Sequence, residues 1–78
     1  MELTFDTHGM DVLSAQKALE RFIASAPHDC TVIRVIHGYH HGEAIKTMVQ
    51  DVNQLRSKRI VRRNRTLNPG ETVLVIQH

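Results

Sequence analysis

The chain has 78 residues, of which 41% are hydrophobic, a formal net charge of +2 and one cysteine. This length predicts one globular domain over residues 1–78, and a lone cysteine cannot form an internal disulfide, so the fold needs no oxidising compartment. No apolar stretch approaches the ~20 residues of a membrane span and no signal-peptide pattern opens the chain, so we expect a cytoplasmic protein with no membrane partner.

The first segment predicts a strand followed by a helix. Residues Leu3–Phe5 alternate in polarity and should form a short strand that ends at Asp6. Asp11 has the chemistry of an N-cap, because its carboxylate can accept an unpaired backbone N–H of the first helical turn. Apolar residues then recur at steps of three and four, which predicts one buried helix face: Val12, Ala15, Leu19, Phe22, Ile23 and Ala26. Pro27 should end this helix near Ser25 or Ala26.

The second segment repeats this pattern. Residues Cys30–Ile36 are β-branched and nearly continuously apolar, apart from Arg34, and predict a buried strand. Cys30 opens that strand, so we interpret it as a core residue rather than a nucleophile. A second helix should begin near Gly42 or Glu43, again with one apolar face: Ile45, Met48, Val49, Val52 and Leu55.

The last part of the chain is strongly basic. Residues 1–55 contain four Lys or Arg against seven Asp or Glu, whereas residues 56–78 contain six Lys or Arg against Glu71 alone, a net charge of +5. All six cations fall between Arg56 and Arg65. Two interpretations stay open: a solubilising surface, or a set of cations that contacts a phosphate backbone.

The predicted element order is βαβαββ. A third strand should begin at Ile60-Val61, Asn68-Pro69-Gly70 has turn chemistry, and Thr72–Ile76 predicts a strong final strand. Crossovers between parallel strands are right-handed, so both helices should cover the same face of the sheet. We therefore predict an α/β (α+β) two-layer sandwich with a four-stranded mixed sheet, two helices on one face and a terminal hairpin.

Two His-Gly pairs lie at the strand-to-helix corners. His8-Gly9 follows the first strand, and the stretch 35–42, Val-Ile-His-Gly-Tyr-His-His-Gly, follows the second. If these strands are parallel, both corners open at the carboxyl edge of the sheet, where ligands bind in α/β folds. Glycine permits a close approach of the backbone to a ligand, a helix N-terminus binds phosphate, and imidazoles can donate to phosphate or move a proton.

The candidate residues divide between these corners and the basic run. At the first corner, Asp6 and His8 are either a reacting pair or a cap on the strand end. The loop histidines lack a standard zinc spacing, so we expect no structural metal site. Tyr39 either stacks on a base or covers the loop. The candidate nucleic-acid contacts are His37, Gly38, Tyr39, His40, His41, Gly42, Lys46, Arg59, Arg62, Arg63 and Arg65.

Strand alternation makes a further prediction about the basic run. Side chains of a strand point alternately to its two faces, so Arg63 and Arg65 should share one face and Arg62 should take the other. One of these faces must meet the helices. The three arginines should therefore not contribute equally to binding.

From Leu3 to Ile76 the chain resembles the Smr (small MutS-related) domain family. Residues 5–9, Phe-Asp-Thr-His-Gly, are similar to its Leu-Asp-x-His-Gly motif, and residues 35–38, Val-Ile-His-Gly, are similar to the start of its His/Thr-Gly-x-Gly motif. Two positions depart from the family pattern. Thr7 replaces an aliphatic residue, and His40 replaces the second glycine, although Gly42 falls where many members carry a further glycine.

The resemblance implies a sandwich like the C-terminal domain of bacterial translation initiation factor three. It also implies nucleic-acid binding and endonuclease activity, either nicking of branched or duplex DNA or cleavage of structured RNA. Asp6 and His8 are then implicated in cleavage, and His37, Gly38 and Gly42 in substrate binding.

Several alternatives stay open. Cleavage of RNA through its 2′-hydroxyl would require no cofactor, whereas DNA needs an attacking water, which favours a divalent metal ion at Asp6. A nucleic-acid-binding module without catalysis is the main alternative, and a protein-interaction module is the third. The sequence does not separate DNA from RNA or predict an oligomeric state.

Overall fold

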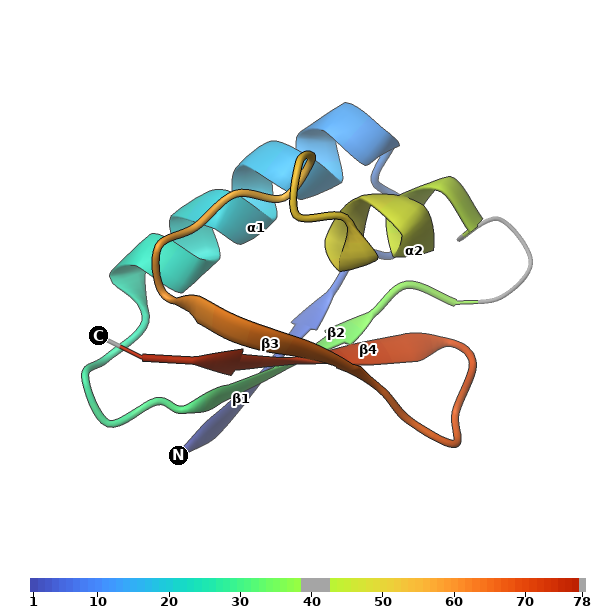
Figure 1. Ribbon diagram of the computed structural model, residues 1–78. Helices are drawn as coiled ribbons and strands as arrows, with labels where there is room; N and C mark the ends of the chain where they lie inside the picture. The colour runs from blue at the N-terminus through green and yellow to red at the C-terminus, as the bar shows by residue number, and fades with distance from the viewer. Residues whose placement is uncertain (39–42, 78) are drawn as a thin grey trace.

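The computed structural model describes residues 1–38 and 43–77 and has the predicted element order (Figure 1). The elements are β1 (Glu2–Asp6), α1 (Val12–Ser25), β2 (Val32–Ile36), α2 (Glu43–Gln50), β3 (Ile60–Arg65) and β4 (Glu71–Ile76). The sheet order is β1-β2-β4-β3, with β1 and β2 parallel and β4 antiparallel to both of its neighbours. Both helices lie over one face of this mixed sheet, which confirms the predicted two-layer sandwich (Figure 1). No helix in the described ranges is long and apolar enough to cross a membrane.

Helix α1 begins and ends where its sequence predicts. The Asp11 carboxylate accepts a hydrogen bond from the backbone N–H of Ser14 at 2.7 Å, and this bond lowers the pKa of Asp11. The predicted stripe faces the sheet, with Ala15, Leu19 and Ile23 fully buried. Because the helix cannot continue into Pro27, its C-cap is Ala26.

The core lies between the helices and the sheet, and the other face of the sheet is uncovered. In β2, Ile33 and Val35 are fully buried, whereas Val32 and Ile36 are only half-buried on the opposite face. The predicted buried strand is therefore buried on one face only, because the helices cover one side of the sheet. Cys30 is buried in the core, as predicted.

Arg34 lies on the uncovered face, which explains why a cation interrupts an apolar strand. Its guanidinium forms ion pairs with Glu2 of β1, at 3.0 Å, and with Glu71 of β4. Hydrogen bonds and charge from Glu2, and then from Glu71, raise the pKa of Arg34. The pairs link three neighbouring strands across the open face.

Helix α2 is shorter than its apolar periodicity predicts. It ends at Gln50, after which the Asp51 carboxylate accepts hydrogen bonds from the backbone N–H of Asn53 (2.8 Å) and the side-chain amide of Gln54 (3.0 Å). These bonds lower the pKa of Asp51 and hold a turn in place of another helical turn. Val52 is consequently 69% exposed, and the prediction that it belongs to the buried stripe was wrong.

Candidate nucleic-acid interface

The two His-Gly corners meet at the carboxyl edge of the parallel strands, as predicted. Asp6 pairs in register with Ile36, and the carbonyl of Ile36 accepts from the backbone N–H (3.0 Å) and the hydroxyl (2.9 Å) of Thr7. Gly9 and Gly38 have φ of 79° and 74°, a left-handed conformation that glycine adopts without strain. A Cβ at either glycine would meet no atom of the described residues within 4 Å.

Thr7 is a structural part of this site, although in the sequence it stands out only as a departure from the family motif. It is 3% exposed, and both of its donors bind the carbonyl at the end of β2. The sequence contains a signal for the burial of Thr7, because Leu3, Phe5 and Thr7 are spaced two residues apart and so point to the same face of the strand. An aliphatic side chain could fill this position but could not donate the second hydrogen bond.

Asp6 and His8 are two residues apart and both exposed, and no hydrogen bond or ion pair joins their side chains. The Asp6 carboxylate accepts the backbone N–H of His8 at 2.9 Å, which forms a tight turn at the strand end. Among the described residues the His8 imidazole has no hydrogen-bond partner. It is therefore open to a ligand, while Asp6 positions the backbone that carries it.

His37 is turned inward. The residue is only 6% exposed, and its Nε2 lies 2.9 Å from the Thr72 hydroxyl. The same hydroxyl accepts a hydrogen bond from the Gln50 side-chain amide at 3.0 Å. Its Nδ1 lies 3.1 Å from the Gly38 carbonyl. Both ring nitrogens are thus used within the protein, and the His37 imidazole does not belong to the proposed contact surface.

The second corner is joined to the turn between β3 and β4. The carbonyl of Gly70 accepts the backbone N–H groups of both His37 and Gly38, each at 2.9 Å. The sequence indicates only a turn residue at Gly70, so this link comes from the structure. The remaining predicted residues of this corner, Tyr39, His40, His41 and Gly42, lie outside the described residues.

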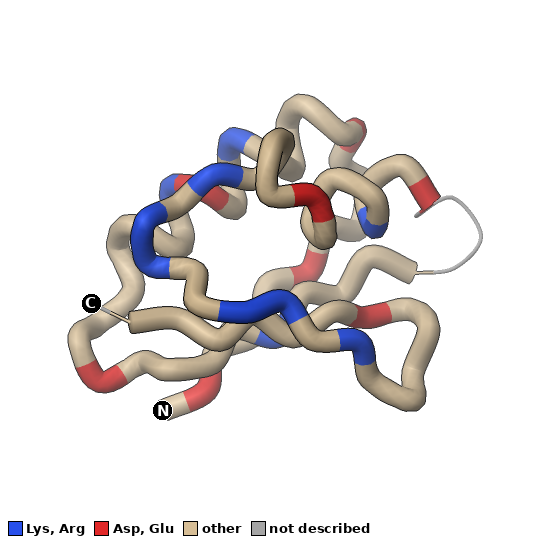
Figure 2. Tube along the Cα trace, viewed as in Figure 1, with Lys and Arg blue, Asp and Glu red and all other residues tan. Residues whose placement is uncertain are grey.

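The basic run extends along the α2–β3 connection and β3 (Figure 2), and two of its arginines bind carbonyls at the helix ends. Arg59 donates to the carbonyls of Ile23 (2.6 Å) and Ala26 (2.8 Å) at the end of α1, and to the carbonyl of Gln77 at 2.7 Å. Carbonyls at a helix C-terminus lack intrahelical donors and carry partial negative charge, so a cation stabilises them.

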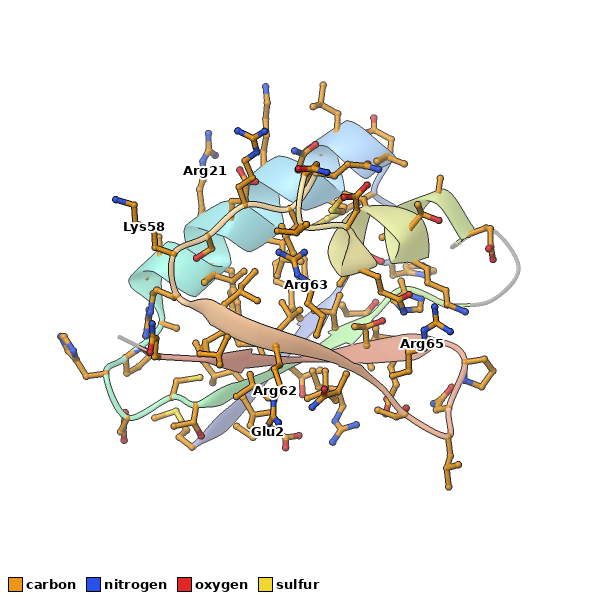
Figure 3. The ribbon with its side chains drawn as sticks, in the orientation of Figure 1. Glu2, Arg21, Lys58, Arg62, Arg63 and Arg65 are labelled. Atoms are coloured by element: carbon orange, nitrogen blue, oxygen red, sulfur yellow. The ribbon has the colours of Figure 1, made fainter. Side chains whose placement is uncertain are left out.

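Arg63 has the same role at α2. It lies between the sheet and the helix layer and donates to the carbonyls of Val49 (2.9 Å), Asp51 (3.0 Å) and Leu55 (2.7 Å) (Figure 3). Burial lowers the pKa of the Arg63 guanidinium, and the charge of Asp51 raises it to a smaller extent. Neither Arg59 nor Arg63 presents its guanidinium as a free surface cation.

Arg62 and Arg65 are exposed and point to opposite faces, which confirms the predicted alternation. Arg65 lies opposite buried Thr72, on the side of the helices, whereas Arg62 lies opposite Val75 on the uncovered face (Figure 3). The side chain of Lys46, on α2, has no hydrogen bond or ion pair with another described residue, and the same holds for the side chains of these two arginines. These three predicted cations are available to an anionic ligand.

A second group of exposed cations, which is not among the predicted contact residues, lies on α1 and the α2–β3 connection. The Glu20 carboxylate accepts the backbone N–H of Arg56 at 3.0 Å and so holds the connection against α1. Arg21 and Lys58 project on the same side of the molecule, at the end away from the β3–β4 turn (Figure 3). Lys17, four residues before Arg21, shares its helix face, and that spacing was the available signal.

The described part of the chain contains no group of three or more His, Cys, Asp or Glu that could hold a metal ion. Comparison with known proteins gives one finding: a protein-family model described as the Smr domain matches residues 5–74. No curated protein and no solved structure matches the chain.

Proposed function

The chain belongs to the Smr domain family, and we propose that it binds nucleic acid and cleaves the phosphodiester backbone at the corner between β1 and α1. One observation carries this proposal: the two His-Gly corners are joined at the end of parallel strands. An exposed His8 imidazole, adjacent to Gly9 with its open backbone, lies beside the corner that contains Gly38. A phosphate approaching this edge would meet a proton-transfer group and little steric obstruction.

Surface cations at the same end support binding. Strand β3 runs parallel to β2, because both are antiparallel to β4, so Arg65 at its end lies at the same end of the sheet as the corners. Lys46 lies in α2, which begins after the second corner. Cations that neutralise phosphates supply sequence-independent affinity, which falls as salt concentration rises.

The chemistry that His8 can supply is proton transfer. In RNA the 2′-oxygen would attack the adjacent phosphorus as the bond to the 5′-oxygen breaks, giving a cyclic phosphate and a free 5′-hydroxyl. His8 would accept the 2′ proton or donate one to the leaving oxygen. The Asp6 carboxylate would hold the His8 backbone and add a negative charge near that residue.

DNA lacks the 2′-hydroxyl, so water must attack, and a divalent metal ion held by Asp6 would make that water more acidic. One Asp6 oxygen is already bonded to a backbone N–H, and the described residues offer no cluster of metal-ligating groups. Metal dependence is therefore part of the test.

Binding without cleavage is the second candidate function. It is favoured by the Asp6 carboxylate, which contacts the His8 backbone and not the imidazole. A histidine without a carboxylate partner lacks one of the interactions that usually orient a catalytic imidazole. The two candidates share the same cations and differ only in whether the bound strand is cut.

The test is incubation of the chain with supercoiled plasmid, branched DNA and structured RNA, with Mg²⁺ or with EDTA. We expect cleavage of at least one substrate, its loss in His8→Ala, and a change in affinity of less than about tenfold, because His8 is not a main phosphate contact. His28→Ala is the matched control, an exposed histidine on the α1–β2 connection at the opposite end of the sheet.

Retained cleavage in His8→Ala would contradict the assignment of His8. Salt-sensitive binding by the unaltered chain, without cleavage of any substrate, would support the second candidate.

A further inference from the structure

The turn between β3 and β4 carries the most exposed large apolar side chain of the described residues. Leu67 has 104% of its reference exposure, compared with 69% for Val52 and 59% for Leu13. A side chain as exposed as in an extended chain gains nothing from burial on folding. Leu67 is followed, after Asn68, by the exposed Pro69, so two apolar side chains occupy this tip.

Hydrogen bonds hold the tip in one conformation. The Asn68 side-chain carbonyl accepts the backbone N–H of Gly70 at 2.9 Å, and its backbone carbonyl accepts that of Glu71 at 3.2 Å. The Thr66 hydroxyl accepts the backbone N–H of Asn68 at 3.1 Å and lies 3.1 Å from the Glu71 carboxylate. A preordered turn loses little conformational entropy when its tip enters a binding site.

The tip is also fixed relative to the proposed interface. Gly70 accepts two backbone hydrogen bonds from the second corner, through His37 and Gly38. Arg65, at the end of β3, places an exposed guanidinium just before the turn. Figure 1 shows the turn extending beyond the end of the sheet, on the side where β2 leads towards α2.

We propose that Leu67 is a wedge that enters a gap in the base stack of a nucleic-acid helix, at a nick, a missing nucleotide or a junction. This inference rests on the proposed nucleic-acid binding and adds the substrate feature that the domain recognises. Leucine and proline are among the apolar residues that proteins insert between base steps. Arg65 is placed to contact a phosphate beside the inserted side chain.

The chemistry of the tip favours a discontinuous helix over an intact one. Unstacking an intact step costs free energy, whereas a gap or junction has already lost part of its stacking. The tip carries no aromatic ring on which a base could stack, so its apolar side chain can only fill a space. The same exposed leucine could enter a pocket of a protein, but the adjacent cation and the link to the second corner favour nucleic acid.

The experiment compares an intact duplex with the same duplex lacking one nucleotide, with 2-aminopurine opposite the gap. Since unstacking is costly, we expect the chain to bind the gapped duplex about tenfold or more tightly and to raise the 2-aminopurine fluorescence. Leu67→Ala and Leu67→Gln should lose this preference and the fluorescence change, yet bind the intact duplex like the parent. Their melting temperatures should match the parent, because Leu67 is not buried.

Val61→Ala is the matched control, because Val61 is another exposed aliphatic residue on β3, 54% exposed and away from the tip. It should keep both the preference and the fluorescence change. Equal affinity of the parent for the two duplexes, or a preference that survives in Leu67→Ala, would overturn the wedge and leave the proposed binding intact. No salt-dependent binding to either duplex would overturn the proposed function itself, and the wedge with it.

Discussion

The role of each candidate side chain depends on which atoms it contacts. Asp6 was a candidate partner for the His8 imidazole, and the structure gives it the backbone N–H of that residue instead, at 2.9 Å. The contact with the backbone changes the expected role of Asp6, because a side chain that accepts an N–H needs an oxygen atom but no charge. Asp6 and His8 can therefore be tested separately.

Substitution of Asp6 by asparagine separates charge from geometry. The asparagine side-chain oxygen can still accept the His8 N–H, so folding should be unchanged, whereas the negative charge near a developing imidazolium is lost. We expect Asp6→Asn to slow cleavage by about tenfold or more and to leave nucleic-acid affinity within about twofold, because a neutral amide cannot stabilise the positive charge that forms on the ring during proton transfer. Single-turnover cleavage rates over a pH series would measure this.

Asp6→Ala is the companion variant, because it also removes the acceptor of the turn. Full activity in Asp6→Asn together with loss of activity in Asp6→Ala would restrict Asp6 to a positioning role.

At the level of elements, the carbonyls at the C-terminal end of each helix accept hydrogen bonds from an arginine in another part of the chain. Arg59 binds carbonyls at the end of α1, and Arg63 binds carbonyls at the end of α2. One planar guanidinium can bind several carbonyls at once, which an ammonium group cannot do in the same geometry. These contacts join the β3 segment to both helices.

Arg63→Lys is expected to lower the free energy of unfolding by about 1.5–2 kcal/mol, the lower part of the range for hydrogen bonds to charged groups, since Arg63 is partly exposed. Arg62→Lys, one residue earlier on the open face, is the control and should change stability by less than about 0.5 kcal/mol. Urea unfolding followed by circular dichroism measures both. Equal stability of the two variants would mean that the carbonyls at the end of α2 do not depend on Arg63.

At the level of the whole molecule, the fold divides the five candidate contact cations into two sets. Arg59 and Arg63 bind backbone carbonyls, while the side chains of Lys46, Arg62 and Arg65 have no hydrogen-bond or ion-pair partner among the described residues. Figure 2 shows that the basic positions extend from the outer side of the helices to the β3–β4 hairpin rather than forming a single patch. The net charge of the last third therefore overstates what a ligand can contact.

The salt dependence of binding should reveal this division. Arg65→Gln and Arg62→Gln should each weaken binding to all sequences alike and reduce the slope of log K against log salt by about one where the arginine contacts a phosphate. Because Arg65 lies at the corner end of the sheet, we expect it to have the larger effect. Fluorescence anisotropy at several salt concentrations measures the slopes.

Arg63→Lys, which keeps the charge, should leave the slope unchanged. A slope that is unaffected in the Arg62→Gln, Arg65→Gln double variant would show that these residues do not contact phosphate and only make the surface more soluble.

The element order, the cap of α1 and the two corners were predictable from the sequence, because each depends on residues close together in the chain. Apolar periodicity marks a helix face, Asp11 caps its own first turn, and a His-Gly pair after a strand marks a corner. The end of α2 was not predictable from periodicity, because Asp51 bonds its own turn and stops a pattern that continues to Leu55.

Only the tertiary structure decided what His37, Arg59 and Arg63 do. Their partners lie up to 36 residues away: Thr72 for the imidazole, Ile23 for Arg59 and Val49 for Arg63. An arginine in a sequence is equally suited to a phosphate, to water or to a helix carbonyl, since all three offer oxygen acceptors. Which acceptor it meets depends on the packing of β3 against the helix ends, and local sequence chemistry does not contain that information.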